Sequence, residues 1–272
     1  MNKKFDSELL RNLQLTLASM LDEIVRICDK HNLQYFLIGG TLLGAARHKG
    51  FIPWDDDLDI AMPRNDYEKF QKICIRELNE DYYLHSIDTD PKYWVSFIKI
   101  RKKGTIFEPR QDVTIDTPYK GVYIDIFPLD NAKKESSFMQ NIQSYICKGL
   151  TSFQYRRRKA TMITKTPLPL KLLYPFLSLF SIETISRLIS KVMQWNKNDD
   201  ALYYANIGSF MNIKKQTIPK EKLFPVKKLE FEGKMYSVPR DYDYVLRKSY
   251  GDYMVLPPED KRVTHRPNRI EL

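Results

Sequence analysis

A glycine turn followed by a dense run of aspartates limits what this chain can fold into more than any other feature. Residues 35–38 are a short apolar run that ends at Gly39-Gly40, which predicts a buried strand and then a helix at residues 41–47. Such a turn lets backbone N–H groups approach an anion closely, because glycine lacks Cβ. A tight strand-to-helix turn needs glycine for steric reasons alone, so this signal by itself leaves both interpretations open.

The acidic run PWDDDLD that follows supplies the second half of the pattern. A strand is predicted at residues 57–60, and side chains alternate along a strand, so Asp57 and Asp59 share one face. Asp55 joins them if the strand extends backward, and Asp56 points away.

A cation between these carboxylates is the expected consequence, since like charges so close together repel each other. Oxygen ligands select Mg²⁺ or Mn²⁺ over zinc. A solvated acidic loop is the alternative, but Trp54, Leu58 and Ile60 make the segment more apolar than such a loop usually is. The sequence therefore favours a metal site.

A further carboxylate, Asp125, lies in a strand predicted at residues 122–127 that is otherwise apolar. A buried carboxylate without a partner is costly, on the order of several kcal/mol. Asp125 therefore needs a metal, a cation or a hydrogen-bond network. A pair with Lys99 or Arg101, which share one face of a strand predicted at residues 94–101, is the structural alternative.

The rest of the chain predicts an α+β fold, with a mixed sheet and helices followed by a mostly helical half that begins near residues 130–135. Two helices are predicted in the first part: one near residues 9–28, capped by Asp6 or Ser7, and one that a capping box at Asn65 and Glu68 opens and that runs to residue 78. Further strands are predicted at residues 82–86 and 105–107, and further helices at 136–158 and 182–196. Near the end, a hairpin of 226–231 and 234–238 turns at Glu232-Gly233, and a helix at 241–250 stops at Gly251.

Composition and charge narrow the class of protein. The chain has 272 residues, 43% of them hydrophobic, which is enough to fill a core. Its net charge of +10, from 44 Lys and Arg against 34 Asp and Glu, favours anionic partners such as nucleotides, nucleic acid, lipid head groups or anionic polymers. The basic residues are dispersed and form no nucleic-acid-binding motif, so no nucleic-acid partner is expected.

Cysteine usage and the terminal segments predict a cytoplasmic protein. Cys28, Cys74 and Cys147 are scattered in helix-like apolar contexts, which indicates reduced, buried thiols. The start of the chain is not a signal peptide, and no apolar run reaches the roughly 18 residues that a spanning helix needs.

The block LIGGTLLGAARHKGFIPWDDDLDI, residues 37–60, closely resembles the LicD family of the nucleotidyltransferase superfamily. This family includes bacterial phosphocholine transferases and, more distantly, fukutin-type ribitol phosphate transferases. The Lys99-Ile100-Arg101 segment, residues 123–130 and the tail from Tyr250 to Met254 are similar to the family as well. The resemblance covers most of residues 30–130 and again 224–265, whereas residues 136–220 match no family pattern.

The resemblance implies a nucleotidyltransferase-like sheet and a metal-dependent phosphotransferase. Such an enzyme moves a phospho-alcohol group, most often phosphocholine from CDP-choline, onto a sugar hydroxyl and releases CMP. The acceptor is a cell-surface glycan or a lipid-linked glycan, such as a precursor of lipopolysaccharide, capsule or teichoic acid. CDP-ethanolamine, CDP-glycerol and CDP-ribitol are alternative donors, and activation of a sugar or small molecule by a nucleotidyltransferase is an alternative reaction. A degenerate, scaffolding family member is a third possibility, which the intact aspartates argue against.

The resemblance also assigns roles to residues, with Mg²⁺ (or Mn²⁺) as the cofactor. The expected catalytic residues are Asp57, Asp59 and Asp125, and the expected metal ligands are the same three with Asp55. The expected donor-binding residues are Gly39, Gly40, Thr41, Arg47, Lys99, Arg101 and His265.

Three regions follow from this interpretation. Residues 1–135 form the nucleotidyltransferase-like catalytic core, residues 136–220 a helical region that contacts membrane or acceptor, and residues 221–272 a hairpin and helix that complete the site. In the middle region, basic residues at 156–159 lead into the aromatic and aliphatic run at 168–177, a pattern typical of peripheral contact with the inner face of the plasma membrane. An internal helical hairpin explains the same pattern equally well.

Overall fold

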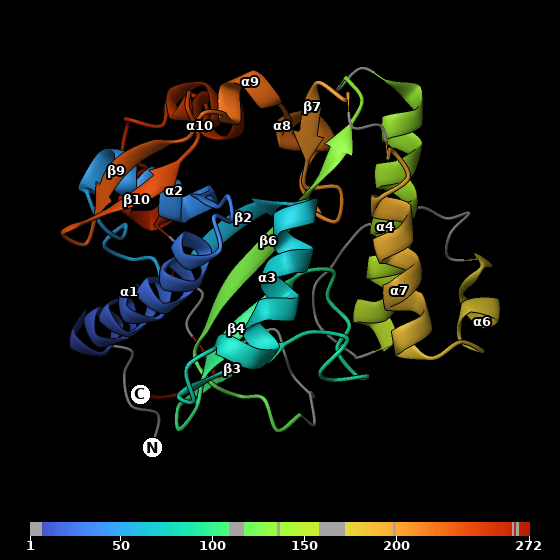
Figure 1. Ribbon diagram of the computed structural model, residues 1–272, viewed down its shortest axis with the longest axis horizontal. Coiled ribbons are helices and arrows are strands. Elements are labelled where there is room, and N and C mark those ends of the chain that lie inside the picture. The colour runs from blue at the N-terminus through green and yellow to red at the C-terminus, as the bar shows by residue number, and fades with distance from the viewer. Residues whose placement is uncertain are drawn as a thin grey trace.

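A curled mixed sheet forms the centre of an α+β fold in the computed structural model, which describes residues 7–108, 117–134, 137–157, 172–197, 200–262, 264 and 267–272 (Figure 1). The strands of this sheet run in the order β1-β2-β6-β4-β3, and β7 and β8 extend it from the end of β6. Their bounds are β1 Phe36–Leu37, β2 Asp59–Pro63, β3 Tyr82–His85, β4 Ile98–Lys102, β6 Tyr123–Ala132, β7 Tyr203–Ala205 and β8 Thr217–Pro219.

The register of the three central strands aligns the charged residues. β2 and β6 are parallel with Asp59 opposite Asp125, and β4 runs antiparallel to β6 with Lys99 also opposite Asp125. Residues that lie opposite each other in a sheet point to the same face. One face of the sheet therefore carries these three charges, while Ile60 and Ile126 lie on the other.

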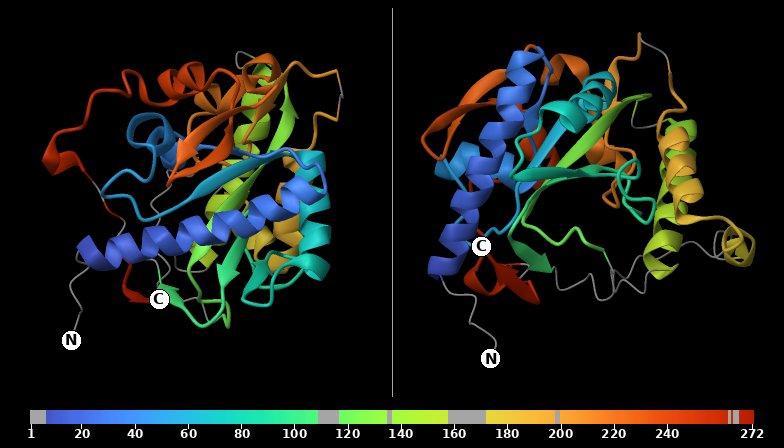
Figure 2. Two further views of the ribbon diagram at one scale, coloured as in Figure 1. Left: turned by 60° about the vertical axis from the view of Figure 1, so that its left-hand side comes forward. Right: turned by 60° about the horizontal axis from the view of Figure 1, so that its bottom comes forward.

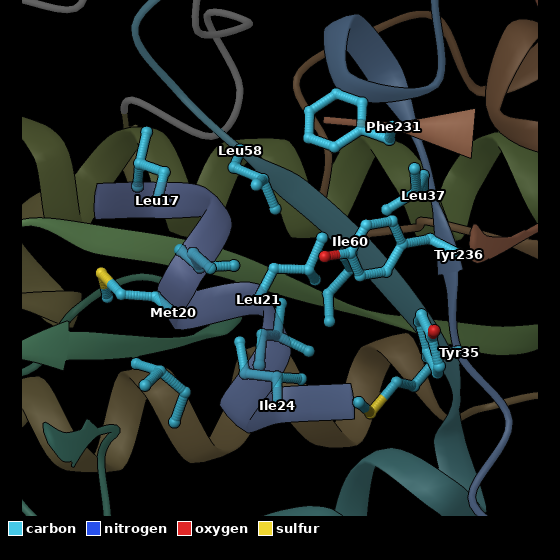
Figure 3. Packing of buried hydrophobic residues seen from close by; sticks show 14 of the residues in the cluster. Leu17, Met20, Leu21, Ile24, Tyr35, Leu37, Leu58, Ile60, Phe231 and Tyr236 are labelled. Carbon is cyan, nitrogen blue, oxygen red and sulfur yellow. The ribbon is translucent and has the colours of Figure 1, made fainter. Parts of the chain in front are cut away.

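The apolar face of the sheet packs against α1 (Ser7–Lys30) and α3 (Arg64–Glu77), which lie in front of it in Figure 1. Figure 3 shows how the buried residues of α1 meet the central strands and the C-terminal hairpin. The labelled residues of this core are Leu17, Met20, Leu21, Ile24, Tyr35, Leu37, Leu58, Ile60, Phe231 and Tyr236. The helix predicted at residues 9–28 is thus confirmed, because its apolar stripe is buried against the sheet.

The hairpin β9 (Lys227–Phe231) and β10 (Lys234–Val238) packs on α2 (Gly39–His48) and β1, beside the glycine turn. Its turn residues Glu232 and Gly233 have φ of 50° and 76°, the left-handed pair that a tight hairpin needs. Helix α10 (Tyr242–Tyr250) follows, capped by Asp241 and ended by Gly251 at φ 72°. The predictions for this C-terminal unit are confirmed.

Helices α4 (Phe138–Arg157) and α7 (Ile182–Met193) pair with each other at one side of the sheet (Figure 2). The buried amide of Gln143 on α4 donates to the carbonyls of Val192 and Met193 at the end of α7, at 2.7 and 3.0 Å. After α7 the chain returns to the sheet, where β7 pairs with residues 130–132 of β6. The two predicted long helices are confirmed, and β7 and β8 are additions that the sequence did not predict.

Smaller elements complete the described part of the fold. These are β5 Ile106–Glu108, α6 Tyr174–Leu177, α8 Ile213–Gln216, α9 Lys220–Leu223, a 3-10 helix at Glu259–Lys261 and β11 Arg269–Glu271. The three cysteines are buried and unbonded to one another, as expected. Among the helices that the structure describes, none has the length and apolar character needed to cross a membrane.

The structure corrects several expected boundaries. Helix α3 begins directly after Pro63 without a side-chain cap, so the capping box predicted at Asn65 and Glu68 does not form. The strand predicted at residues 57–60 begins only at Asp59, because on the β1 side the chain turns into α2 after Leu37; on the β6 side the carbonyl of Leu58 still accepts from the N–H of Asp125 at 3.1 Å.

Two other predicted strands differ from those observed. The strand predicted at residues 94–101 begins only at Ile98, where pairing with β6 starts. The strand predicted at 105–107 pairs with β11 in a small separate sheet.

Candidate functional site

The two glycines of the turn are required by the aspartates that face them. Gly39 opens α2 with φ 58°, and a Cβ on it would lie 3.2 Å from Oδ2 of Asp59. A Cβ on Gly40 would lie only 2.6 Å from Oδ2 of Asp55. Side chains at both positions would push the carboxylates away from the first turn of α2, where the helix dipole stabilises negative charge.

The aspartate run alternates as predicted, although only its last residue belongs to a strand. Asp55, Asp57 and Asp59 are each partly exposed, whereas Asp56 and Leu58 between them are buried, at 3% and 1% exposure. An extended chain with one buried and one open side explains this pattern. Three carboxylates therefore emerge on the open side.

Buried polar side chains fix the backbone of the run. The hydroxyl of Thr41, on α2, accepts a 2.8 Å hydrogen bond from the backbone N–H of Asp59. The amide of Gln14, on α1, donates to the carbonyl of Asp55 at 2.9 Å. Thr41 was expected to contact donor phosphate. Its hydroxyl instead holds β2 in place here, and a phosphate contact stays a prediction.

Negative charge accumulates at this end of the sheet. Burial, and then the negative charges of Asp57, Asp125 and Asp55, raise the pKa of Asp59 well above its ordinary value, and the positive charge of Lys99 opposes them. This accumulation of negative charge is what a bound cation would relieve. Carboxylate oxygens are the donor set of Mg²⁺ and Mn²⁺. In the described part of the chain, however, no three acidic, histidine or cysteine side chains are already arranged to hold a metal ion.

Asp125 forms an ion pair with Lys99, as the structural alternative for it predicted. The ammonium of Lys99 donates to Oδ1 of Asp125 at 2.6 Å and lies 3.5 Å from the centre of the Tyr123 ring. Both charged side chains are largely buried, so neither belongs to a surface pair. Lys99 holds the Asp125 carboxylate on the same sheet face as Asp59.

Arg101 belongs to a buried network that the sequence did not reveal. Its Nε donates to Nδ1 of His85 at 3.0 Å, and its Nη1 donates to the carbonyl of Gly121 at 2.9 Å. Because Nδ1 of His85 accepts, the proton lies on Nε2, which donates to Asp90 at 3.1 Å. Burial and then the charge of Arg101 lower the pKa of His85 to about 3. A contact of Arg101 with donor phosphate stays a prediction.

A cavity of about 180 Å³ opens beside Asp125 on the charged face of the sheet. Its walls combine aromatic rings with charges, from Tyr93, Trp94, Phe97, Tyr123 and Tyr155 and from Asp90, Lys92, Lys99, Arg101 and Asp125. Trp94 and Tyr155 meet edge to face with ring centres 4.1 Å apart. These rings come from distant segments, so no local pattern in the sequence indicates that they line one cavity.

The C-terminal segment contacts the site from α10 onward. Nη1 of Arg47 donates to the carbonyl of Tyr253 at 2.8 Å, so this residue ties α2 to the tail, and its predicted contact with the donor diphosphate is untested. Burial and then the charges of the Asp59, Asp55 and Asp57 carboxylates raise the pKa of Tyr250 to about 12, so its phenol is within electrostatic range of the aspartates. Tyr250 was not among the expected site residues, although it begins the tail segment that resembles the family.

His265, the last predicted site residue, lies outside the described residues. The remaining predicted residues lie on one face of the sheet, in the extended run just before β2, or on α2, where Arg47 belongs to the last turn of the helix.

Comparison with known proteins adds independent information. Residues 32–168 match the family described as LicD/FKTN/FKRP, nucleotidyltransferase domain. Over 260 residues the chain is 31% identical to the lipopolysaccharide cholinephosphotransferase LicD of Haemophilus influenzae, a match that covers 94% of this chain and 95% of that protein.

Two partial matches are shorter. The chain is 44% identical over 59 residues to an uncharacterized protein of Rickettsia typhi, covering 22% of this chain and 19% of that protein. It is also 44% identical over 50 residues to the human ribitol 5-phosphate transferase FKRP, covering 18% of this chain and 10% of that protein.

Proposed function

Because the chain belongs to the LicD/FKTN/FKRP family, we propose that it transfers phosphocholine from CDP-choline to a sugar hydroxyl and releases CMP, with Mg²⁺ or Mn²⁺ as cofactor. The acceptor is a cell-surface glycan, and the similarity to the Haemophilus protein favours lipopolysaccharide. The observation that carries the proposal is the group of aspartates around Asp59, opposite the first turn of α2.

The aspartate group suits a metal that arrives together with the donor. Mg²⁺ is commonly held by one or two carboxylates plus substrate phosphates rather than by a complete cage of protein ligands. Asp57 and Asp59, assisted by Asp55, fit this role, which is consistent with the lack of a ready-made three-ligand group among the described residues. A bound ion of this kind neutralises phosphate oxygens and so lowers the barrier to attack on phosphorus.

Residues of the chain itself position the reacting groups. The N–H groups of the first turn of α2 favour the negative charge of the donor phosphates. Asp125 accepts the proton of the acceptor hydroxyl, and Lys99 fixes the orientation of that carboxylate at 2.6 Å. The attacking oxygen and the leaving CMP then lie in line across the phosphorus.

The cavity beside Asp125 supports choline as the transferred alcohol. Aromatic faces attract a quaternary ammonium, whereas a polyol such as glycerol or ribitol needs hydrogen-bonding groups. The cavity offers the rings of Trp94, Phe97 and Tyr155 and the carboxylate of Asp90. Its wall also carries the cations Lys92, Lys99 and Arg101. Lys99 is paired with Asp125, and Arg101 donates to His85 and Gly121. The cavity volume of about 180 Å³ limits the group that it admits to a small one.

Calorimetric titration with CDP-choline, CDP-ethanolamine, CDP-glycerol and CDP-ribitol in the presence of Mn²⁺ tests this assignment. CDP-choline is expected to bind most tightly, and Tyr155→Leu is expected to weaken that binding roughly 2- to 30-fold, the range of a cation–π contact. Tyr145→Leu is the matched control, since Tyr145 is an exposed tyrosine of the same helix. Equal affinity for CDP-choline and CDP-glycerol would show that the transferred alcohol is not choline.

The same assay mixture separates transfer from nucleotide activation. A phosphocholine transferase releases CMP from CDP-choline only when an acceptor hydroxyl is present. An enzyme that activates a small molecule instead consumes CTP and releases pyrophosphate. Release of pyrophosphate from CTP, without release of CMP from CDP-choline, would favour this second reaction.

A further inference from the structure

An exposed apolar surface lies far from the aspartates, at and around α6. Leu172, Leu173, Phe176, Leu179 and Phe180 all keep large fractions of their side chains in solvent, up to 78% for Leu179. Figures 1 and 2 show this segment at the outer edge of the molecule, beyond the α4–α7 pair. We refer to these five residues as the α6 face. A contiguous apolar patch of this kind marks an interaction surface on a soluble domain.

The α6 face is held in place rather than loosely attached. Nη1 of Arg157, the last residue of α4, donates to the carbonyl of Phe180 at 2.6 Å. The ring of Tyr174 contacts Phe153 of α4 at 5.1 Å between ring centres, and the guanidinium of Arg156 lies 5.8 Å from the same ring. These contacts present the apolar side chains outward on a fixed support.

The stretch of sequence that contains the α6 face carries basic residues and no acidic ones. Between residues 136 and 182 there is no Asp or Glu, and this stretch supplies most of the net charge of +10. Its basic residues are Lys148, Arg156, Arg157, Arg158, Lys159, Lys165 and Lys171. The partner of this surface must therefore be anionic as well as apolar.

We propose that the α6 face lies on an anionic lipid bilayer. Its leucine and phenylalanine side chains enter the boundary between head groups and acyl chains, and basic side chains beside them, Arg156 and Arg157 among the described residues, pair with anionic head groups. An anionic bilayer matches both properties of the surface at once. This inference does not depend on the donor or on the reaction proposed above.

Sedimentation of the full chain with vesicles tests the proposal. The wild type is expected to bind vesicles made of equal parts phosphatidylglycerol and phosphatidylcholine, and to bind pure phosphatidylcholine vesicles much more weakly. Raising the ionic strength is expected to weaken binding, because salt screens the head-group charge. The double variant Phe176→Ser/Leu179→Ser is expected to lower partitioning about tenfold or more, since two large apolar side chains are lost from the contact.

Leu202→Ser is the matched control, because Leu202 is an equally exposed leucine outside this segment. Absence of wild-type binding at low salt would overturn the proposal, as would binding that the double variant leaves unchanged. A double variant with a lowered melting temperature and unchanged vesicle binding would show that the protein covers this face itself. A wild type that self-associates without binding vesicles would show that the α6 face joins two copies of the chain. Either of these last two results would contradict a membrane role.

Discussion

Single hydrogen bonds position the aspartates, and Thr41 provides the clearest case. Its buried hydroxyl accepts from the N–H of Asp59 at 2.8 Å. We expect Thr41→Val, which keeps the shape and loses the hydroxyl, to lower the free energy of unfolding by about 1 kcal/mol and to reduce the rate of CMP release. Thr41→Ser keeps the acceptor and is expected to retain most of both. Equal activity of the valine and serine variants would mean that this bond does not position Asp59 for catalysis.

His85 predicts a dependence of stability on pH. Its pKa is lowered from 6.5 to about 3, first by burial and then by the charge of Arg101, so the folded protein keeps it neutral. Below pH 6.5 the imidazole of His85 binds a proton in the unfolded chain but stays neutral in the folded protein. The contribution of His85 to stability is therefore complete above that pH and is lost as the pH falls toward about 3.

Urea unfolding at neutral and mildly acidic pH measures this effect. We expect the wild type to lose stability on acidification more steeply than His85→Gln, which has no imidazole to protonate. Equal slopes for the two proteins would contradict the assignment.

At the residue level, the sequence predicted the alternation of the aspartates well and the buried partners of other charged residues poorly. Strand alternation was enough to separate Asp56 from its neighbours, because one side of the run is buried and the other open. The partners of His85, which are Arg101 and Asp90, lie on another strand and in a loop, so no local period reveals them. Tyr250 was missed for the same reason, since α10 reaches the aspartates only in the folded chain.

At the level of elements, a buried ion pair joins α3 to the end of β6. Nε and Nη2 of Arg64 donate to the two carboxylate oxygens of Asp130, at 2.7 and 2.8 Å, and Asp130 is only 1% exposed. Breaking a buried pair leaves one charge without its partner, at a cost of roughly 3–5 kcal/mol. We expect Arg64→Met to lower the free energy of unfolding by that amount.

The double variant Arg64→Met/Asp130→Leu removes both charges and is expected to recover most of the loss. Arg187→Met, which breaks the exposed pairs with Glu183 and Asp88, is the control and is expected to cost less than about 1 kcal/mol. Denaturant unfolding of the four proteins measures these differences. A double variant no more stable than Arg64→Met would show that the pair is not what holds α3 on the sheet.

Element prediction succeeded where a pattern is long or a turn is specific. The amphipathic stripe of α1 and the Glu232-Gly233 turn of the hairpin each determine local structure without help from distant residues. Strands β7 and β8 are three residues each and form only because the end of β6 is available for pairing. The strand predicted at residues 105–107 is observed as β5, yet it pairs with β11 outside the main sheet. Which strands pair with each other at these places depends on tertiary contacts.

At the scale of the whole molecule, the site combines parts that are far apart in the sequence. The aspartates follow α2, Asp125 comes from β6, and Tyr250 comes from the end of α10. The aromatic cavity next to them includes a residue of α4, whereas the α6 face lies on the opposite side of that helix pair. This arrangement separates the proposed reaction from the proposed membrane contact, so each can be removed without the other.

The rate of CMP release from CDP-choline, followed in chelator-treated protein with lipopolysaccharide as acceptor and with Mn²⁺ or Mg²⁺ restored, tests the role of the aspartates most directly. The wild type is expected to be inactive without metal and active with it. Asp57→Asn and Asp59→Asn are each expected to lower the rate about a thousandfold or more while remaining folded. Asp81→Asn, which changes an exposed aspartate away from the site, is expected to match the wild type. Metal-independent release of CMP, or an active Asp57→Asn/Asp59→Asn double variant, would contradict the account.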